Sequence, residues 1–471
     1  MTSRALSVLL GSAACAALAV SAVAGAGTTA IAGHSTNAVP AVPVVHIRPM
    51  SHRVGRVTAA PPTTAQCRSK YGIYCYGAKQ IEHAYDESPL FAKGIKGQGQ
   101  TIVIVDAFGS PTIKHDLAKF DRTYHLSAPP SLKVIRPAGK FHWKANPTDE
   151  GWAGETTLDV EYSHTIAPKA KILLVETPKS EEEGRSGFPQ IVRAENYVIN
   201  HHLGGVISQS FGATEQSFAD AQALLSLRSA YKNAAKHNVT VLTASGDSGA
   251  TDSTYDENHT YKHPVTSWPD SDPLITGIGG TRLTLNGHGK HLEPDVAWND
   301  TYNKALLNYF GEPGPTPLAT GGGKSVIFKR PTWQRHVKSV VGSRRGVPDI
   351  SMSGSCSGGV NTYQSFPGQP AGWEPTCGTS EATPLFAGIV ALSEQVAHHK
   401  LGLINPALYK LSAEHAKGLV DVTSGNNTVT FTQKGKQYTV KGFSSRKGYD
   451  LTTGVGTVDA AKFVKELARV G

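Results

Sequence analysis

The chain lacks the features that nucleic-acid-binding, zinc-binding and membrane-spanning proteins need. It carries 46 Lys and Arg against 37 Asp and Glu, yet no dense basic run with interleaved aromatic residues, which favours a solvated basic surface over a nucleic-acid interface. It has no CxxC motif and no histidine-rich cluster that would suit zinc. Beyond the N-terminus, no segment is long and apolar enough to span a bilayer. We therefore expect a soluble mature protein without stable membrane association.

The first 26 residues have the pattern of a secretory signal peptide. Arg4 precedes an apolar, alanine-rich run, and the small residues at 22–26 (AVAGA) suit the signal peptidase. An uncleaved membrane anchor is the alternative, but no polar stop-transfer flank follows the run. Cys15 lacks the leucine, three residues earlier, that a lipoprotein signal requires. The pattern therefore predicts a secreted, extracellular protein.

Few cysteines are present, and their number suits an exported chain. Four remain after the signal peptide: Cys67, Cys75, Cys356 and Cys377. An even number in an exported chain suggests two disulfides, and four cysteines allow three pairings. The sequence-local pairing, Cys67–Cys75 with Cys356–Cys377, is favoured. The second bridge would hold still the segment that leads to Ser380.

The character of the chain changes at Cys67. Residues 27–66 are rich in Ala, Pro, Val, Thr and Ser without a helical or strand period, which predicts a flexible leader or short propeptide. Residues 67–471 are expected to form one large domain. Its short apolar runs, at 101–105, 171–175, 205–208 and 239–243, alternate with helical stretches at 188–201 and 217–237. This alternation predicts the doubly wound α/β class, a mostly parallel sheet with helices on both faces.

Polar residues follow several of the predicted strands. Asp106 comes directly after the first, residues 208–212 after the third, and Asp247 lies in the segment SGDSG after the fourth. In open parallel sheets functional groups gather at the carboxyl ends of the strands. The alternative is that each aspartate belongs to a turn that caps the next helix.

The segment CGTSEATPLFAG, residues 377–388, contains a candidate nucleophile. Ser380 lies between a glycine turn and an apolar run that is typical of a buried helix. At a helix N-terminus free backbone N–H groups can bind an oxyanion. A serine there is also an ordinary helix N-cap, so a catalytic role requires a base.

A histidine is the familiar base for a nucleophilic serine. The tripeptide HGT, which surrounds that histidine in subtilisin-type peptidases, occurs nowhere in the chain. His164 is the nearest candidate, and a triad of Asp106, His164 and Ser380 remains an alternative. A lone histidine near a helix end is more often a structural residue.

A pair of carboxylates is the better candidate. In residues 154–171 (GETTLDVEYSHTIAPKAK), a helical run must end before Pro168. Glu155 and Asp159 are four residues apart, so their carboxyls project from one helix face and can share a proton. The alternative is a tolerated like-charged pair on a solvated face.

Together with other segments, these residues resemble the sedolisins, the serine-carboxyl peptidases, which have a subtilisin-like fold and a Ser-Glu-Asp triad. The resemblance extends in order from about Tyr71 to Leu467. The matching segments are 97–105 (GQGQTIVIV), 155–161 (ETTLDVE), 207–212 (ISQSFG), 244–249 (ASGDSG), 279–281 (GGT), 321–325 (GGGKS), 347–350 (VPDI) and 378–380 (GTS). ExxLD, SGDSG and GTS together, without HGT, make the resemblance specific.

The resemblance implies a role for each candidate residue. Ser380 is the nucleophile, Glu155 the general base, and Asp159 orients Glu155 and shares a proton with it. Asp247 supplies the oxyanion hole together with the Ser380 N–H, and Asp106 supports the network. A carboxylate is a weak base that needs a shielded hydrogen-bond network, and an aspartate donates a hydrogen bond only while protonated. An acidic working pH follows.

The same resemblance implies one Ca²⁺ ion near the C-terminus. The ligands would be the carboxylates of Asp421 and Asp450 and the carbonyls of Val422, Arg446 and Gly448, a set that suits a hard cation. Sedolisins usually have glycine where Arg446 stands, but a carbonyl ligand does not depend on its side chain. The alternative is a pair of Asx turns that close glycine-rich loops.

The chain also departs from the family pattern. Sedolisins are generally made with a long folded prosegment, whereas only about forty residues separate the signal peptide from Cys67, too few for such a domain. Glu381, directly after the nucleophile, is larger and more acidic than the residue that sedolisins usually carry there, and we expect it on the primed side of the cleft.

The leading interpretation is a secreted, acid-acting serine endopeptidase that cleaves proteins or peptides through an acyl-enzyme. We expect it to be a monomer. The alternatives are a His-dependent subtilisin-type peptidase, an exported tripeptidyl peptidase, and a catalytically silent binding protein on the same scaffold.

Overall fold

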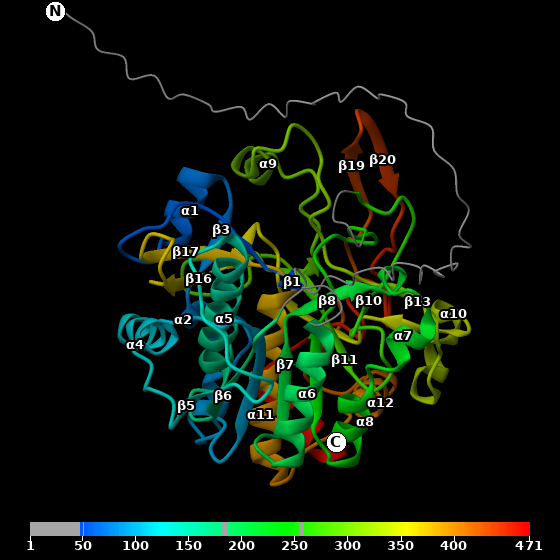
Figure 1. Cartoon of the computed structure of the whole chain (residues 1–471), viewed down its shortest axis with the longest axis horizontal. Coiled ribbons are helices and arrows are strands. Elements are labelled where there is room, and N and C mark those ends of the chain that lie inside the picture. The colour runs from blue at the N-terminus through cyan, green and yellow to red at the C-terminus, as the bar shows by residue number, and fades with distance from the viewer. Residues whose placement is uncertain (1–47, 50, 180–186, 255–258) are drawn as a thin grey trace, which may run out of the picture. The chain divides into compact units, whose positions relative to one another are not determined.

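A mostly parallel sheet lies at the centre of the fold (Figure 1). The computed structural model describes residues 48–49, 51–179, 187–254 and 259–471, so the predicted signal peptide and the first part of the predicted leader lie outside the described residues. The sheet order is β12-β11-β9-β7-β4-β6-β5, with β15 beside β11. Its strands are β4 (Thr101–Ala107), β5 (Leu132–Ile135), β6 (Lys171–Thr177), β7 (Val206–Gln209), β9 (Thr240–Ala244), β11 (Thr276–Arg282), β12 (Val296–Ala297) and β15 (Ile350–Ser353). β12 pairs antiparallel with β11, and the other pairs in this sheet are parallel.

Successive residues of the central strands enter two different cores. On β4, Ile102 and Ile104 pack into one core, and Val103 and Val105 pack into the other. Such continuous apolar runs are expected where both faces of a sheet are covered. Helices α5 (Pro147–Ile166) and α11 (Thr379–Ala397) contribute to the first core, and α6 (Gly187–Asn200) and α8 (Ser229–Lys236) to the second. The four predicted strands and the doubly wound arrangement are therefore confirmed.

The remaining elements surround this centre. The other helices are α1 (Thr64–Tyr71), α2 (Ala78–Ala84), α3 (Ser88–Phe91), α4 (Ile113–Tyr124), η2 (Glu215–Ser217), α7 (Ala221–Leu225), α9 (Lys304–Phe310), η3 (Thr332–Val337), α10 (Lys338–Val341), α12 (Asn405–Ala413) and α13 (Ala460–Val470). The other strands are β1 (Arg48–Pro49), β2 (His52–Arg53), β3 (Tyr74–Tyr76), β8 (Phe211–Thr214), β10 (Ser267–Trp268), β13 (Gly323–Lys329), β14 (Arg344–Val347), β16 (Gly358–Gln364), β17 (Gly372–Cys377), β18 (Leu419–Val420), β19 (Val429–Gln433), β20 (Lys436–Val440) and β21 (Thr457–Val458). Across the described ranges, no helix has the length and apolarity needed to cross a membrane.

Helix α5 carries the two candidate carboxylates and is longer than predicted. The side chain of Asn146 accepts a hydrogen bond from the Asp149 N–H at 2.9 Å, and Pro147 occupies the first turn. Both residues favour a helix start, so α5 begins at Pro147 rather than near Gly154. Its residues from Trp152 to Ile166 are buried. The carboxylate pair therefore does not lie on a solvated face.

Helix α11 positions Ser380 in its first turn. Gly378, at its N-cap, has a φ of 129°, a conformation that favours glycine. The Gly378 N–H donates to the Gly354 carbonyl at 2.8 Å, and the Glu381 N–H donates to the Gly378 carbonyl at 2.9 Å. These bonds turn the chain sharply from β17 into the helix, as the glycine before the serine predicts.

The predicted helix at 217–237 is wrong as a single element. The structure has η2 followed by two separate helices, α7 and α8. Asp220 accepts a hydrogen bond from the Ala223 N–H at 2.8 Å and starts α7 as its N-cap. A side-chain cap inside an apolar-periodic stretch begins a new helix, and the periodicity alone does not reveal it.

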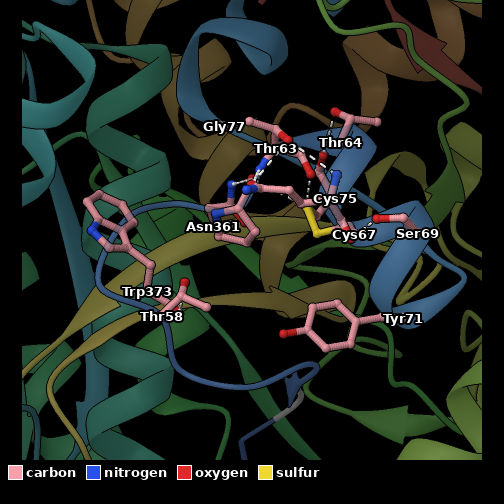
Figure 2. Close-up of a disulfide and its surroundings, with 12 residues drawn as sticks. Thr58, Thr63, Thr64, Cys67, Ser69, Tyr71, Cys75, Gly77, Asn361 and Trp373 are labelled. Carbon is pink, nitrogen blue, oxygen red and sulfur yellow. Dashed lines mark hydrogen bonds between the residues drawn. A yellow bond between two sulfur atoms is a disulfide. The ribbon is translucent and has the colours of Figure 1, made fainter.

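Both predicted disulfides are present. Cys67 and Cys75 join α1 to β3 with a Cα separation of 5.9 Å, and Figure 2 shows this bridge near Thr64, whose hydroxyl donates to the Cys75 carbonyl. Cys356 and Cys377 join with a Cα separation of 4.9 Å. The second bridge fixes the end of β17 directly before the turn into α11.

The described part of the predicted leader forms short strands that pair with the rest of the fold. β1 pairs antiparallel with β8, and β2 pairs antiparallel with β17 in a sheet of order β2-β17-β16-β3. Further along, the Val54 N–H donates to the Pro375 carbonyl at 2.7 Å, and the Thr58 N–H donates to the Trp373 carbonyl at 2.8 Å. Backbone pairing to a strand edge needs no side-chain period, so composition could not predict it.

Candidate active site

The candidate site lies where α5 and α11 meet the carboxyl ends of the central strands. Ser380 in α11, Glu155 and Asp159 in α5, and Asp106 near the end of β4 have no exposed surface. Asp247 follows β9 and is 7% exposed. The five residues predicted from the sequence are thus positioned by four separate elements of one buried region.

Glu155 lies beside two hydroxyls and two other carboxyls. Burial raises the pKa of Glu155 well above its ordinary value, and the charges of Asp106 and Asp247 raise it further. Hydrogen bonding from the hydroxyls of Ser380 and Ser51 lowers it. Burial therefore disfavours the charged form that a general base needs, and the two hydroxyls favour it.

Asp159 and Asp106 continue the network behind Glu155. Burial raises the pKa of Asp159, as do the charges of Asp106 and Glu155, while the Ser210 hydroxyl opposes this by donating to Asp159 Oδ1 at 2.9 Å. Burial raises the pKa of Asp106 to about 7, against a hydrogen bond of 2.8 Å from Thr156 Oγ1. Each of these carboxyls raises the pKa of a neighbour through its charge, so ionising all of them together is disfavoured.

Asp247 is tied to the residue before Ser380. Its Oδ1 accepts hydrogen bonds from the Thr379 N–H at 2.8 Å and from Thr379 Oγ1 at 2.7 Å. Its Oδ2 lies 3.3 Å from Nε2 of His52. The carboxyl is thus held beside the N-terminus of α11, where helix N–H groups favour a developing negative charge.

His164 does not join this site. Its Nε2 lies 3.2 Å from Asp121 Oδ1 and 3.1 Å from the Ser127 carbonyl oxygen. It is nine residues beyond Glu155 on α5, which places it about 13 Å farther along the helix axis. The structure therefore does not assemble the alternative triad of Asp106, His164 and Ser380.

Sequence reasoning missed several neighbours of the candidate residues and misplaced one. Thr156, Ser210 and Thr379 hold the carboxyls, and all three lie in the quoted segments ETTLDVE, ISQSFG and GTS, which could have identified them. Ser51 and His52 come from the leader, where nothing in the composition marked them. Glu381 is fully buried, so it does not line the cleft as expected.

The two loops of the predicted calcium site lie together. The Gly448 N–H donates to Asp421 Oδ2 at 2.8 Å, and the Arg446 N–H donates to Asp450 Oδ2 at 2.9 Å. Asp450 Oδ1 also accepts a hydrogen bond from the Thr452 N–H at 3.0 Å. This is the contact of an Asx turn, the alternative to a calcium site. Among the described residues no group of three or more His, Cys, Asp or Glu side chains could hold a metal. Two carboxylates with backbone carbonyls nevertheless fit a hard cation.

Comparison with known proteins places the chain in a family. The subtilase family matches residues 144–449. Kumamolisin from Bacillus sp. (strain MN-32) is 30% identical over 398 residues, which cover 83% of this chain and 63% of that protein. Tripeptidyl-peptidase 1 from Homo sapiens is 27% identical over 75% of this chain and 57% of its own length. The chain thus spans less than two thirds of these relatives.

A solved structure extends the similarity to the fold. Pseudomonas sedolisin, a serine-carboxyl proteinase complexed with two molecules of pseudo-iodotyrostatin, is 25% identical with a TM-score of 0.66. The match covers 83% of this chain and 97% of that chain, which confirms the predicted subtilisin-like fold. The chain therefore belongs to the subtilase family of serine-type peptidases, and it is similar to kumamolisin and to sedolisin.

Proposed function

We propose that the protein is a secreted, acid-acting serine-carboxyl endopeptidase that acts as a monomer on proteins or peptides. One observation carries the proposal: Ser380, at the N-terminus of α11, lies beside Glu155 in a buried cluster of carboxyls. The similarity to sedolisin-type relatives supports the same chemistry. We thus propose Ser380 as the nucleophile and Glu155 as the base, together with an acid optimum and export from the cell.

Each catalytic step has a residue in place. Ser380 Oγ attacks the scissile carbonyl carbon while Glu155 takes its proton, and Asp159 shares that proton. The Ser380 N–H and a protonated Asp247 bind the oxyanion. Glu155 then gives the proton to the leaving amine, which leaves an acyl-enzyme. A water activated by Glu155 hydrolyses the ester and restores Ser380.

The proposal is tested by digesting an unfolded protein substrate at pH 3 to 8 and identifying the products by mass spectrometry. Internal fragments are expected from an endopeptidase. Tripeptides released in order from the N-terminus would instead favour the tripeptidyl-peptidase alternative, and no cleavage by a folded, calcium-loaded sample would favour the silent binding protein.

Replacing His164 separates the two possible bases. We expect His164→Asn to retain kcat/KM within a few-fold, because His164 contacts Asp121 and the Ser127 carbonyl rather than Ser380. Activity is measured at a temperature where circular dichroism shows the variant folded, since a buried side chain is lost. Loss of activity in a folded sample would restore the histidine alternative.

We also propose that Asp421 and Asp450, with the carbonyls of Val422, Arg446 and Gly448, hold one Ca²⁺ ion. Bound calcium would fix the two C-terminal loops to each other, since each loop supplies one carboxylate to it.

Chelation tests this site. We expect EDTA to lower the melting temperature by several degrees, because a ligand at one hundred times its Kd stabilises a fold by about 2.7 kcal/mol. Excess Ca²⁺ should restore it, and Asp421→Asn should abolish the response. If neither EDTA nor Asp421→Asn changes the melting temperature, Asp421 and Asp450 form turns and do not bind calcium.

A further inference from the structure

Residues 48–49 and 51–53 lie beside the candidate active site. Pro49 pairs with Phe211 of β8, directly after the Ser210 that contacts Asp159. His52 pairs with Cys377 of β17, the strand that leads into Ser380. The segment therefore passes the catalytic serine between two strand edges, antiparallel to each. Extended peptides are recognised in this way, with main-chain bonds for affinity and side-chain pockets for specificity.

Side chains of this segment contact the proposed catalytic carboxyls. His52 Nε2 lies 3.3 Å from Asp247 Oδ2, and the Ser51 hydroxyl lowers the pKa of the Glu155 carboxyl, which burial raises. Ser51 and His52 are thus neighbours of the proposed catalytic residues. Arg53 follows them in the chain.

Arg53 lies against a buried acid that has little else to pair with. Its Nη1 is 3.6 Å from Glu374 Oε1, and the side chain of Glu374 is 6% exposed. Within the described part of the chain, Glu374 Oε1 has no hydrogen-bond partner. Burial raises the pKa of Glu374, and the charge of Arg53 opposes this rise. A buried carboxylate is costly without a cation beside it, so the site favours a cationic side chain, the place that Arg53 takes here.

The space around Arg53 suits a long basic side chain. Gly154 of α5 lies on the opposite side, where a Cβ would stand 3.6 Å from Arg53 Cδ. Arg53 itself remains 30% exposed. The stem of the Arg53 side chain therefore passes Gly154 while its charged end reaches Glu374 and stays partly open to solvent.

We propose that Glu374 is a specificity-determining residue that binds an arginine or lysine two or three residues C-terminal to the cleaved bond. This inference rests on the proposed function, because a residue that binds substrate has a role only if the protein acts on peptides. Glu374 lies outside the catalytic cluster, so it would affect binding of the substrate and not the reaction itself. Ser51 is a neighbour of Glu155, and Arg53 lies two residues farther along the chain. This spacing sets the number of residues between the cleaved bond and the basic side chain of the substrate.

The first test is a competition between two peptides that differ only at this position, one with arginine and one with glutamine. Both are cleaved in one reaction by the full chain, so occupancy of the cleft by the leader reduces both rates alike and leaves their ratio unchanged. We expect kcat/KM to favour arginine about tenfold, as for a charge-assisted contact. Glu374→Gln should reduce the ratio below twofold, whereas Glu312→Gln, an exposed acid of matched chemistry, should leave it unchanged. An equal rate for both peptides with the unmodified chain would overturn the proposal.

A binding arm separates this inference from the catalytic one. Fluorescent forms of the two peptides are titrated by anisotropy against Ser380→Ala combined with Arg53→Ala, so that the leader's own arginine is absent from the pocket. Tighter binding of the arginine peptide, lost on adding Glu374→Gln, supports the subsite even if no peptide is ever cleaved. Equal Kd values, or no binding of either peptide, count against the subsite even if cleavage is efficient.

Discussion

Replacing Ser380 with alanine is expected to lower kcat/KM for peptide hydrolysis by at least about 10³-fold, the usual effect of removing a nucleophile. Ser380 has the position that this role needs, in the first turn of α11 beside Glu155. The loss should appear in kcat, because the hydroxyl forms the acyl bond and contributes little to substrate binding. It is measured under conditions in which both proteins are fully folded.

The same helix offers a matched control. Ser393 is also fully buried, and its hydroxyl donates to the Ile389 carbonyl at 2.9 Å. Ser393→Ala removes the same atom at a distance from the site and should keep activity within a few-fold. If Ser380→Ala retained a tenth or more of the wild-type kcat, another residue would have to be the nucleophile.

The second large effect concerns stability against pH. We expect the free energy of unfolding to fall as pH rises from about 4 to 7. Asp106 has its pKa raised by burial from 3.8 to about 7, so the folded state keeps a proton that the unfolded state has released. Stability falls with pH wherever the folded state binds more protons. For Asp106 alone the span corresponds to at most about 4 kcal/mol.

Asp106 is one of many such groups. Burial also raises the pKa of a larger set of fully buried carboxyls: Glu87, Glu155, Asp159, Glu161, Glu195, Asp270, Asp300 and Glu381. The stabilisation that each contributes is complete below its unfolded pKa and is lost as pH rises through its folded one. The fold as a whole is therefore expected to be most stable in acid.

Urea unfolding at pH 4, 5, 6 and 7 tests this expectation with Asp106→Asn. Asparagine imitates the protonated acid, so the variant should lose less stability over this range than the wild type. The exposed acid Glu312 serves as control, because Glu312→Gln should follow the wild-type curve. A wild-type stability that rises steadily from pH 4 to 7 would contradict the raised pKa values of the buried carboxyls.

The parts of the fold that are set by regular patterns could be predicted from the sequence. The apolar runs at 101–105 and 171–175 are strands because both faces of the sheet are buried. The four-residue spacing of Glu155 and Asp159 carries over directly to one face of α5. A glycine before Ser380 likewise predicts the turn into α11.

Features that depend on a single capping contact or on distant strand edges could not be predicted. Asn146 starts α5 and Asp220 starts α7 through one side-chain hydrogen bond each. The leader pairs with β8 and β17 through its backbone, which leaves no sequence period. The contact between Arg53 and Glu374 joins residues more than three hundred positions apart, and no local pattern signals it.

The most direct test of the central claim is the pH dependence of kcat/KM for the wild type beside Glu155→Gln. Glutamine keeps the size of the side chain but cannot accept the serine proton. The account predicts a wild-type maximum below pH 6 and a loss of about 10³-fold or more in the variant at every pH. A maximum at neutral pH that survives Glu155→Gln would contradict it, because a base other than the carboxyl pair would then activate Ser380.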